Sequence, residues 1–150
     1  MGRFSTAEIT EAFERYQQRA AEAGRSGDWN PWADQFTEDA VYVEHLYGEF
    51  HGREEIRSWI TRTMGAPPGS EMPHFPIEWF LIDAERDRVV CWVWNRMEDP
   101  GDGSIHQEGN ITLLDYAGND QWSREEDIYN PARFGPMIEQ WQAAKDSANS

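Results

Sequence analysis

Three pairs of polar side chains occur with one residue between their members, each in or beside a β-rich segment. The pairs are Tyr42 with Glu44, Arg96 with Glu98, and Asp127 with Tyr129. Successive side chains of a strand point to opposite faces, so residues two apart share a face. If all three shared faces point inward, four charged groups and two tyrosine hydroxyls converge in one site.

Such a cluster is suited to acid–base catalysis. A guanidinium at Arg96 would hold neighbouring carboxylates in a fixed geometry and favour their ionised forms. A third carboxylate in an apolar cavity would have its pKa raised, so one carboxyl group would be an acid and another a base. Water activated by Asp127, with proton donation from Glu98, would open an epoxide. Proton transfer through Glu44 would isomerise or cyclise a ketone.

These charges also have an interpretation without chemistry. Arg96 and Glu98 lie near the end of an expected strand, where charged side chains commonly face solvent. The acidic run from Glu125 to Asp127 is typical of a solvated face. Alternation limits that interpretation, because Glu125 and Asp127 both point inward if Tyr129 does.

Aromatic residues are numerous: eight Trp, seven Phe and five Tyr among 150 residues. This content indicates either a thick aromatic core or an aromatic-lined cavity for a small hydrophobic molecule. The side chains expected to contact such a ligand are Tyr16, Trp32, Phe36, Trp59, Trp92, Trp94, Asn110 and Tyr129. For Tyr16, core packing explains the residue better than a catalytic role does.

The charge balance argues against several partners. The chain has 13 basic and 28 acidic residues, a formal net charge of −15. Nucleic-acid binding needs Lys and Arg clusters that this sequence lacks, and an acidic chain is repelled by anionic membrane surfaces. No apolar run approaches the length of a membrane span. We expect no nucleic-acid or membrane partner, and a cytoplasmic, reducing location.

We expect neither a metal nor a cofactor. The single cysteine, Cys91, excludes a disulfide framework and a cysteine-based zinc site. The four histidines show no metal-ligand spacing on one helix, and no glycine-rich strand-to-helix turn offers a phosphate site. His74 stays a candidate base, because it lies beside a proline-rich loop and imidazole titrates near neutral pH.

Hydrophobic periodicity predicts helices from Ser5 to Gly24, from Asp28 to about Thr37, after Gly52, and after Asn130. Runs rich in aromatic and β-branched residues predict strands at 40–45, 75–82, 88–98, 105–116 and 121–129, the last four forming an antiparallel meander. The order predicts a single α+β domain over residues 1–150, with helices packed on one face of a curved antiparallel sheet.

The segment FTEDAVYVEH, the helix start GREEI and the late strand ending in IYNPARF resemble SnoaL-like proteins of the nuclear transport factor two-like superfamily. The resemblance covers almost the whole chain. It implies a conical half-barrel, with a curved antiparallel sheet wrapped around the N-terminal helices and an apolar pocket, often in a dimer. This fold hosts isomerases, hydrolases, dehydratases, cyclases and proteins with no chemistry.

Limonene epoxide hydrolases of this superfamily carry a Tyr and an Asn two apart on the first strand, an Arg-x-Asp further on, and a second Asp. Here Tyr42 matches the Tyr and Glu44 replaces the Asn. Arg96 and Glu98 resemble the Arg-x-acid pair, and Asp127 resembles the second Asp.

Two other families match in part. Glu44 has the spacing from Asp39-Ala40 that the base of ketosteroid isomerases has, and Tyr16 resembles their helix-one Tyr, but their second acid would fall near Thr112. His74 resembles a histidine of scytalone dehydratases, whose aspartate partner has no match here.

Together these features predict a cofactor-independent acid–base enzyme acting on a small apolar or polycyclic molecule. Epoxide opening or hydration is slightly preferred over isomerisation or cyclisation. The alternative is a non-catalytic domain that binds a hydrophobic ligand or serves dimerisation. Because the run VVCWVW is apolar on both faces of its strand, we also expect a homodimer through the sheet.

Overall fold

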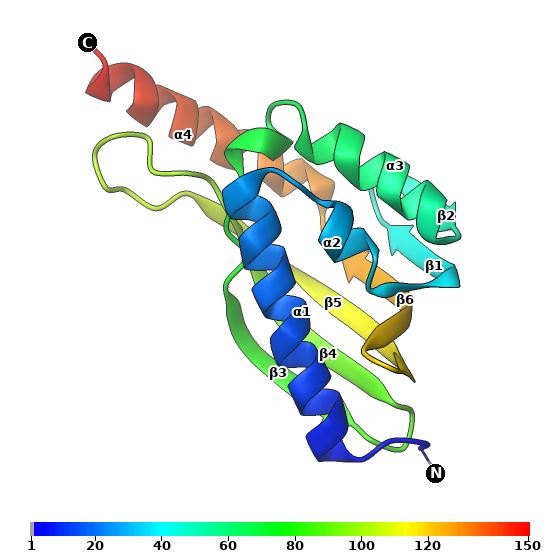
Figure 1. Ribbon diagram of the computed structural model, residues 1–150. Helices are drawn as coiled ribbons and strands as arrows, with labels where there is room; N and C mark the ends of the chain where they lie inside the picture. Colours follow the sequence, from blue (N-terminus) through cyan, green and yellow to red (C-terminus); the bar gives the residue numbers. More distant parts are fainter. Residues whose placement is uncertain (1) are drawn as a thin grey trace.

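The structure, a computed structural model, describes residues 2–150 and consists of helices packed on a six-stranded sheet (Figure 1). The α-helices are α1 (Thr6–Ser26), α2 (Asn30–Ala33), α3 (Arg53–Met64) and α4 (Phe134–Ala148), with short 3-10 turns at Gly69–Glu71 and Pro131–Arg133. The strands are β1 (Phe36–Glu44), β2 (Gly48–His51), β3 (Ile77–Asp83), β4 (Arg88–Arg96), β5 (Gln107–Gly118) and β6 (Gln121–Ile128).

The sheet is curved and mixed rather than wholly antiparallel. Its strand order is β2-β1-β6-β5-β4-β3. Strands β3 to β6 form the expected antiparallel meander, but β1 runs parallel to β6. Strand composition predicts pairing within a meander, whereas the direction of β1 depends on the long connection through α3. The α+β class and the cone-like wrapping of the sheet are confirmed, and the all-antiparallel expectation is wrong at this junction.

Two expected boundaries near β1 are also wrong. The second helix ends at Ala33 instead of Thr37, and β1 begins at Phe36 instead of Ala40. The side chain of Phe36 is fully buried against Trp32, with ring centroids 5.0 Å apart, and its backbone already pairs with β6. Strand β2, which is not among the strands predicted from the sequence, pairs with β1 as a hairpin.

Local capping explains where α1 begins. The hydroxyl of Ser5 accepts a hydrogen bond of 3.1 Å from the Glu8 N–H, as the sequence predicts for the start of α1. At the other end of the chain, the side chain of Asn130 accepts from the Ala132 N–H, but the turn that it caps is a 3-10 turn and α4 follows from Phe134.

The core lies between α1, α2 and α3 and the concave face of the sheet. Helix α1 places Phe13 and Tyr16 on this face, where strands contribute Cys91, Leu114 and Trp122, each at 0% exposure. Burial of each large apolar side chain stabilises the fold by about 1.5–3 kcal/mol. In the part of the chain that the structure describes, no helix is both long and apolar enough to cross a membrane.

The opposite side of the sheet carries a second apolar row, here called the outer face. Its members alternate with the core residues along each strand: Trp79, Leu81, Val90, Trp92, Trp94, Ile111, Leu113 and Ile128. Leu81 is 65% exposed and Trp79 is 41% exposed. The ring of Trp92 lies across the backbone of Gly109, and a Cβ there would be 2.1 Å from Trp92 Cζ2.

We expect Gly109→Ala to lower the free energy of unfolding by about 1–3 kcal/mol, because the added methyl group must displace the Trp92 ring. Urea denaturation of the variant and the wild type measures the difference. In a Trp92→Leu background the same substitution should cost much less, which a double-mutant cycle detects. An equal loss in both backgrounds would show that the ring is not the cause.

Candidate active site

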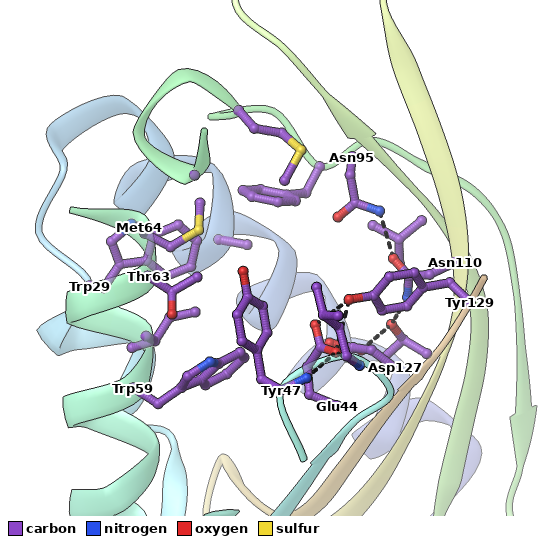
Figure 2. Close-up of a pocket in the computed structure, with 18 of the residues that line it drawn as sticks. Trp29, Glu44, Tyr47, Trp59, Thr63, Met64, Asn95, Asn110, Asp127 and Tyr129 are labelled. Atoms are coloured by element: carbon purple, nitrogen blue, oxygen red, sulfur yellow. Dashed lines mark hydrogen bonds between the residues drawn. The ribbon is translucent and has the colours of Figure 1, made fainter. Parts of the chain in front are cut away.

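A cavity of about 420 Å³ lies between the sheet and the helices (Figure 2). Its walls are mainly apolar and aromatic, and include Trp29, Trp32, Trp59, Met64, Phe75 and Phe134. Polar groups enter from the ends of β1, β5 and β6. The volume falls within the range of about 300–1,000 Å³ that is common for small-molecule sites.

The parallel register of β1 and β6 places the main polar groups side by side. Tyr42 pairs with Glu125, and Glu44 pairs with Asp127. Tyr129 directly follows β6, and its hydroxyl oxygen lies within hydrogen-bond distance of both oxygens of the Glu44 carboxylate, at 2.9 Å and 2.7 Å. Two strands therefore bring three carboxyl groups and two tyrosines to one end of the cavity.

Glu44 is held by backbone and tyrosine donors. Its Oε1 accepts from the Leu46 N–H at 2.7 Å and, at 3.4 Å, from the Tyr47 N–H, whereas Oε2 accepts from Tyr129 alone. Burial raises the pKa of Glu44, and the charge of Asp127 adds to the rise. The hydrogen bonds from Leu46 and Tyr129 oppose this rise in pKa because they favour the ionised carboxylate.

Asp127 lies in a chain of directed hydrogen bonds. Thr112 donates to Asp127 Oδ1 at 2.7 Å, and the Tyr42 hydroxyl contacts Oδ2. The Asn110 amide donates to Thr112 Oγ1 at 2.8 Å, and Asn95 donates to Asn110 Oδ1 at 2.7 Å. Burial raises the pKa of Asp127, although the hydroxyl donors act in the opposite direction.

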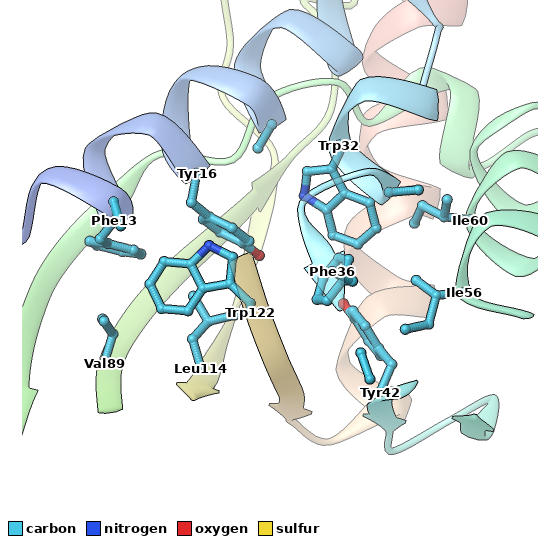
Figure 3. Close-up of a cluster of buried hydrophobic side chains, with 14 of the residues drawn as sticks. Phe13, Tyr16, Trp32, Phe36, Tyr42, Ile56, Ile60, Val89, Leu114 and Trp122 are labelled. Atoms are coloured by element: carbon cyan, nitrogen blue, oxygen red, sulfur yellow. The ribbon is translucent and has the colours of Figure 1, made fainter. Parts of the chain in front are cut away.

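Glu125 lies next to Asp127 on the inner face of β6 and is only 2% exposed. Its Oε1 accepts a hydrogen bond from Tyr16 at 2.7 Å, and its Oε2 lies 2.7 Å from the hydroxyl of Tyr42. Figure 3 shows that both tyrosines belong to the aromatic core around Trp32 and Trp122. Burial, followed by the nearby charge of Asp127, raises the pKa of Glu125.

Eight of the fourteen side chains predicted as site residues line this cavity. They are Tyr16, Trp32, Tyr42, Glu44, Trp59, Asn110, Asp127 and Tyr129. The other six, Phe36, His74, Trp92, Trp94, Arg96 and Glu98, lie elsewhere. Phe36 is a fully buried core residue beneath Trp32, while Trp92 and Trp94 belong to the outer face.

The alternation of side chains along β4 explains why Arg96 is not beside the carboxylates. On β4 the inner row contains the buried Cys91 and Val93 and continues to Asn95, which lines the cavity. Arg96 belongs to the other row, and its Nε donates to Gln107 Oε1 at 2.9 Å. The expectation that Arg96 shares a cavity with Glu44 and Asp127 is wrong.

Glu98 and His74 lie outside the cavity as well. Glu98 follows the end of β4, its side chain is 45% exposed, and its Oε1 is 3.8 Å from Lys145 Nζ. His74 and Arg96 line a separate, more open depression of about 560 Å³ beside the 99–105 loop. The polar neighbours of Asp127 on the sheet are instead Thr112, which donates to it, and Asn110, which donates to Thr112.

The sequence did not lead to Asn95 or Thr112, and for Glu125 it predicted an inward direction without a role. Thr112 shares the inner face of β5 with Asn110, so the same two-residue spacing that identified Tyr42 and Glu44 would have found it. Alternation along β6 likewise predicts that Glu125 points inward with Asp127. Within residues 2–150, no group of three or more His, Cys, Asp or Glu side chains is arranged to hold a metal ion.

The fold and the position of the cavity define a protein of the nuclear transport factor two-like class. The model of the SnoaL-like domain family matches residues 14–113, which are 100 of the 150 residues, and the chain belongs to this family. No curated protein matches the chain.

Solved structures share the fold at low sequence identity. A nuclear transport factor two-like protein from Anabaena variabilis is 14% identical, with a TM-score of 0.62 over 87% of this chain and 95% of that one. A protein with a ketosteroid isomerase-like fold from Catenulispora acidiphila, in complex with trimethylamine, is 24% identical, with a TM-score of 0.60 over 85% and 88%. TerC, co-crystallised with polyporic acid, is 16% identical, with a TM-score of 0.61 over 87% and 98%.

We expect Tyr129→Phe to raise the pKa of Glu44 further, because the variant loses the hydroxyl that stabilises the ionised carboxylate. Carbon-detected NMR titration of the Glu44 carboxyl group measures the shift. Tyr47→Phe is the matched control, since the Tyr47 hydroxyl makes no hydrogen bond to Glu44. An unchanged pKa in Tyr129→Phe would contradict the geometry.

The same variant should change the pH dependence of stability. A carboxyl group whose pKa is raised by folding contributes stability below its unfolded pKa of about 4.3, and this contribution is lost as pH rises through the folded pKa. Since Tyr129→Phe raises the folded pKa, the variant should lose stability relative to the wild type as pH increases from about 4.3 to neutrality.

Proposed function

We propose that this protein is a cofactor-independent acid–base enzyme that transfers a proton on a small, mainly apolar molecule bound in the cavity. The observation that carries the proposal is the position of Glu44 and Asp127. Both carboxyl groups line a mainly apolar cavity. Arg62 also lines it, but no Lys or Arg in residues 2–150 forms an ion pair with either carboxyl group. Carboxyl groups with raised pKa values in a cavity are typical of acid–base sites.

Glu44 is the better-placed base. Its Oε1 is saturated by backbone and tyrosine donors, while Oε2 accepts only from Tyr129 and retains a lone pair for a substrate proton. The rise moves the pKa of Glu44 in the direction of neutral pH, and a general base is most effective when its pKa is near the working pH. Asp127 is the second acid–base group, and its hydroxyl donors fix the orientation of its carboxylate.

The positions of Arg96 and Glu98 make isomerisation or cyclisation the preferred reaction instead of epoxide opening. Epoxide opening by Arg96, Glu98 and Asp127 loses support, because the cation and the proton donor lie outside the cavity. Removal of a proton from carbon next to a carbonyl, followed by isomerisation or cyclisation, requires a base and a donor for the developing oxyanion. Figure 2 shows the hydroxyl of Tyr47 directed into the cavity, where it can serve as that donor.

The proposal predicts exchange of hydrogen next to a carbonyl group. In D₂O the wild type should exchange these hydrogens in members of a panel of alicyclic and polycyclic ketones, as followed by proton NMR. Glu44→Gln should reduce the rate by about 10²-fold or more, because the amide cannot accept the proton. Asp127→Asn should reduce it as well, with little loss of stability, since the carboxylate is buried at a cost to folding.

Glu98→Gln is the matched control, since it removes a carboxylate of the same size outside the cavity. Equal losses in Glu98→Gln and Glu44→Gln would contradict the assigned site. Titration calorimetry would show whether ketones of the panel bind. If they bind but no variant alters the rate of hydrogen exchange, the protein is a non-catalytic binder of hydrophobic ligands, the alternative that the sequence also supports.

We also propose that two copies associate through the outer face. Exposed apolar residues on one side of a sheet commonly mark an interface, and Leu81, Trp79 and Trp94 lie together there. Light scattering at micromolar concentration should give twice the chain mass of 17.4 kDa. Leu81→Lys should give the single-chain mass, whereas Ile105→Lys, at an exposed apolar residue in a loop, should not. A wild-type monomer would contradict the proposal.

A further inference from the structure

The hydroxyl of Tyr42 lies between two carboxyl groups. Its oxygen is 2.7 Å from Glu125 Oε2 and also contacts Asp127 Oδ2. A tyrosine hydroxyl carries one hydrogen, so it can donate to only one of these oxygens. The other contact is a hydrogen bond only if that carboxyl group donates to the tyrosine oxygen. One of the two carboxyl groups must therefore carry a proton.

The outer oxygens of this pair are each occupied by a hydroxyl donor. Tyr16 donates to Glu125 Oε1 at 2.7 Å, and Thr112 donates to Asp127 Oδ1 at 2.7 Å. The Thr112 oxygen accepts from Asn110 at 2.8 Å, and its hydrogen is left for Asp127 Oδ1. The proton is thus located on Oε2 of Glu125 or on Oδ2 of Asp127, facing Tyr42.

Burial selects Glu125 as the protonated partner. Glu125 is 2% exposed, whereas Asp127 is only partly buried and lines the cavity. The ionised form of the more deeply buried carboxyl group loses more solvation, and a glutamate also has the higher intrinsic pKa. The raised pKa of Glu125, caused first by burial and then by Asp127, agrees with this choice.

The groups that face Glu125 from neighbouring elements offer no compensating cation. They are Tyr16 on α1, Tyr42 on β1, Cys91 on β4 and Asp127 on the same strand, while Leu114 pairs with Glu125 from β5. Among the described residues, no Lys, Arg or His forms an ion pair with Glu125. An ionised Glu125 would therefore have only hydroxyl donors against the full charge of Asp127.

We propose that Glu125 is a neutral carboxylic acid at physiological pH, and that it donates a hydrogen bond to Tyr42 so that Tyr42 donates to Asp127 and holds this second acid–base group in its ionised form. The hydrogen bonds then run in one direction, from Tyr16 to Glu125, from Glu125 to Tyr42, and from Tyr42 to Asp127. Glu125 is a positioning residue that acts through Tyr42. Only this catalytic consequence rests on the proposed function; the protonation state does not.

Infrared difference spectroscopy in D₂O tests the protonation state without any substrate. At neutral pH the wild type should show the C=O stretching band of a protonated carboxyl group, separate from the carboxylate bands. Glu125→Gln should abolish this band, and the matched variant Asp127→Asn should retain it. Absence of the band from the wild type, or its loss in Asp127→Asn but not in Glu125→Gln, overturns the proposal.

The pH dependence of unfolding gives a second measurement. Because folding raises the pKa of Glu125, its contribution to stability must fall as pH rises. A neutral Glu125 in the folded protein must release its proton on unfolding at any pH above its unfolded pKa of about 4.3. The unfolding equilibrium constant of the wild type should therefore rise by up to tenfold per pH unit relative to that of Glu125→Gln, up to the folded pKa. Equal pH dependence of the two proteins overturns the proposal.

The catalytic consequence has its own readout. Glutamine presents an amide N–H where the neutral acid presents its O–H, so Glu125→Gln preserves a donor to Tyr42. Where ketone exchange is measurable, Glu125→Ala should lose activity and Glu125→Gln should restore most of the loss. Equal losses in the two variants overturn the positioning role. If no exchange is found in the wild type, the proposed function fails while the infrared and linkage results still decide the state of Glu125.

Discussion

The parallel pairing of β1 with β6 is the constraint on which the candidate site depends. Its register sets Tyr42 beside Glu125 and Glu44 beside Asp127. Neighbouring strands lie about 4.8 Å apart, so these side chains cannot avoid one another once their strands are paired. An antiparallel pairing would have placed the end of β6 beside the start of β1, and the carboxyl groups would have been dispersed along the sheet.

Hydroxyl groups, rather than cations, compensate this crowding. Tyr16, Tyr42, Thr112 and Tyr129 all donate toward the three carboxyl groups. A hydrogen bond to a charged group contributes about 1.5–3 kcal/mol, whereas a guanidinium would also have neutralised the charge. The pKa values of Glu44, Glu125 and Asp127 are consequently raised instead of lowered. These carboxyl groups therefore hold their protons to higher pH than free carboxyl groups do, as acid–base chemistry at a buried site requires.

The sequence predicts which residues of a strand point into the site where the two faces of that strand differ clearly in composition. On β1 the polar pair Tyr42 and Glu44 alternates with valines, and on β6 Asp127 alternates with Glu126 and Ile128. On β4 the run VVCWVW is apolar in both rows, so the pattern does not tell which row faces the helices. The packing of α1 decides it by burying Val89, Cys91 and Val93, which directs Asn95 inward and Arg96 outward.

Pairing direction was the other feature that local pattern could not provide. Composition and turn residues identify the meander, because each of its strands is joined to the next by a segment rich in turn residues and without a helix. Strand β1 instead meets β6 across most of the chain, and its orientation follows from the path through α3 and β3. The family resemblance supplied the cone-like wrapping, while the contact between Tyr42 and Glu125 is visible only in three dimensions.

Strand β4, which is apolar on both faces, contributes to the cavity on one face and to the outer face of the sheet on the other. The inner row of β4 forms part of the cavity wall through Val93 and Asn95, and the outer row carries Trp92 and Trp94. A one-residue shift of this strand would turn its outer row inward. Trp94 would then replace Asn95 in the cavity, and Arg96 would be buried among carboxylates. The large desolvation cost of a buried guanidinium, and the loss of Val89 and Cys91 from the core, oppose that exchange. The hydrophobic packing of α1 on β4 therefore keeps Arg96 away from the cavity, and the carboxyl groups are left to share protons among themselves.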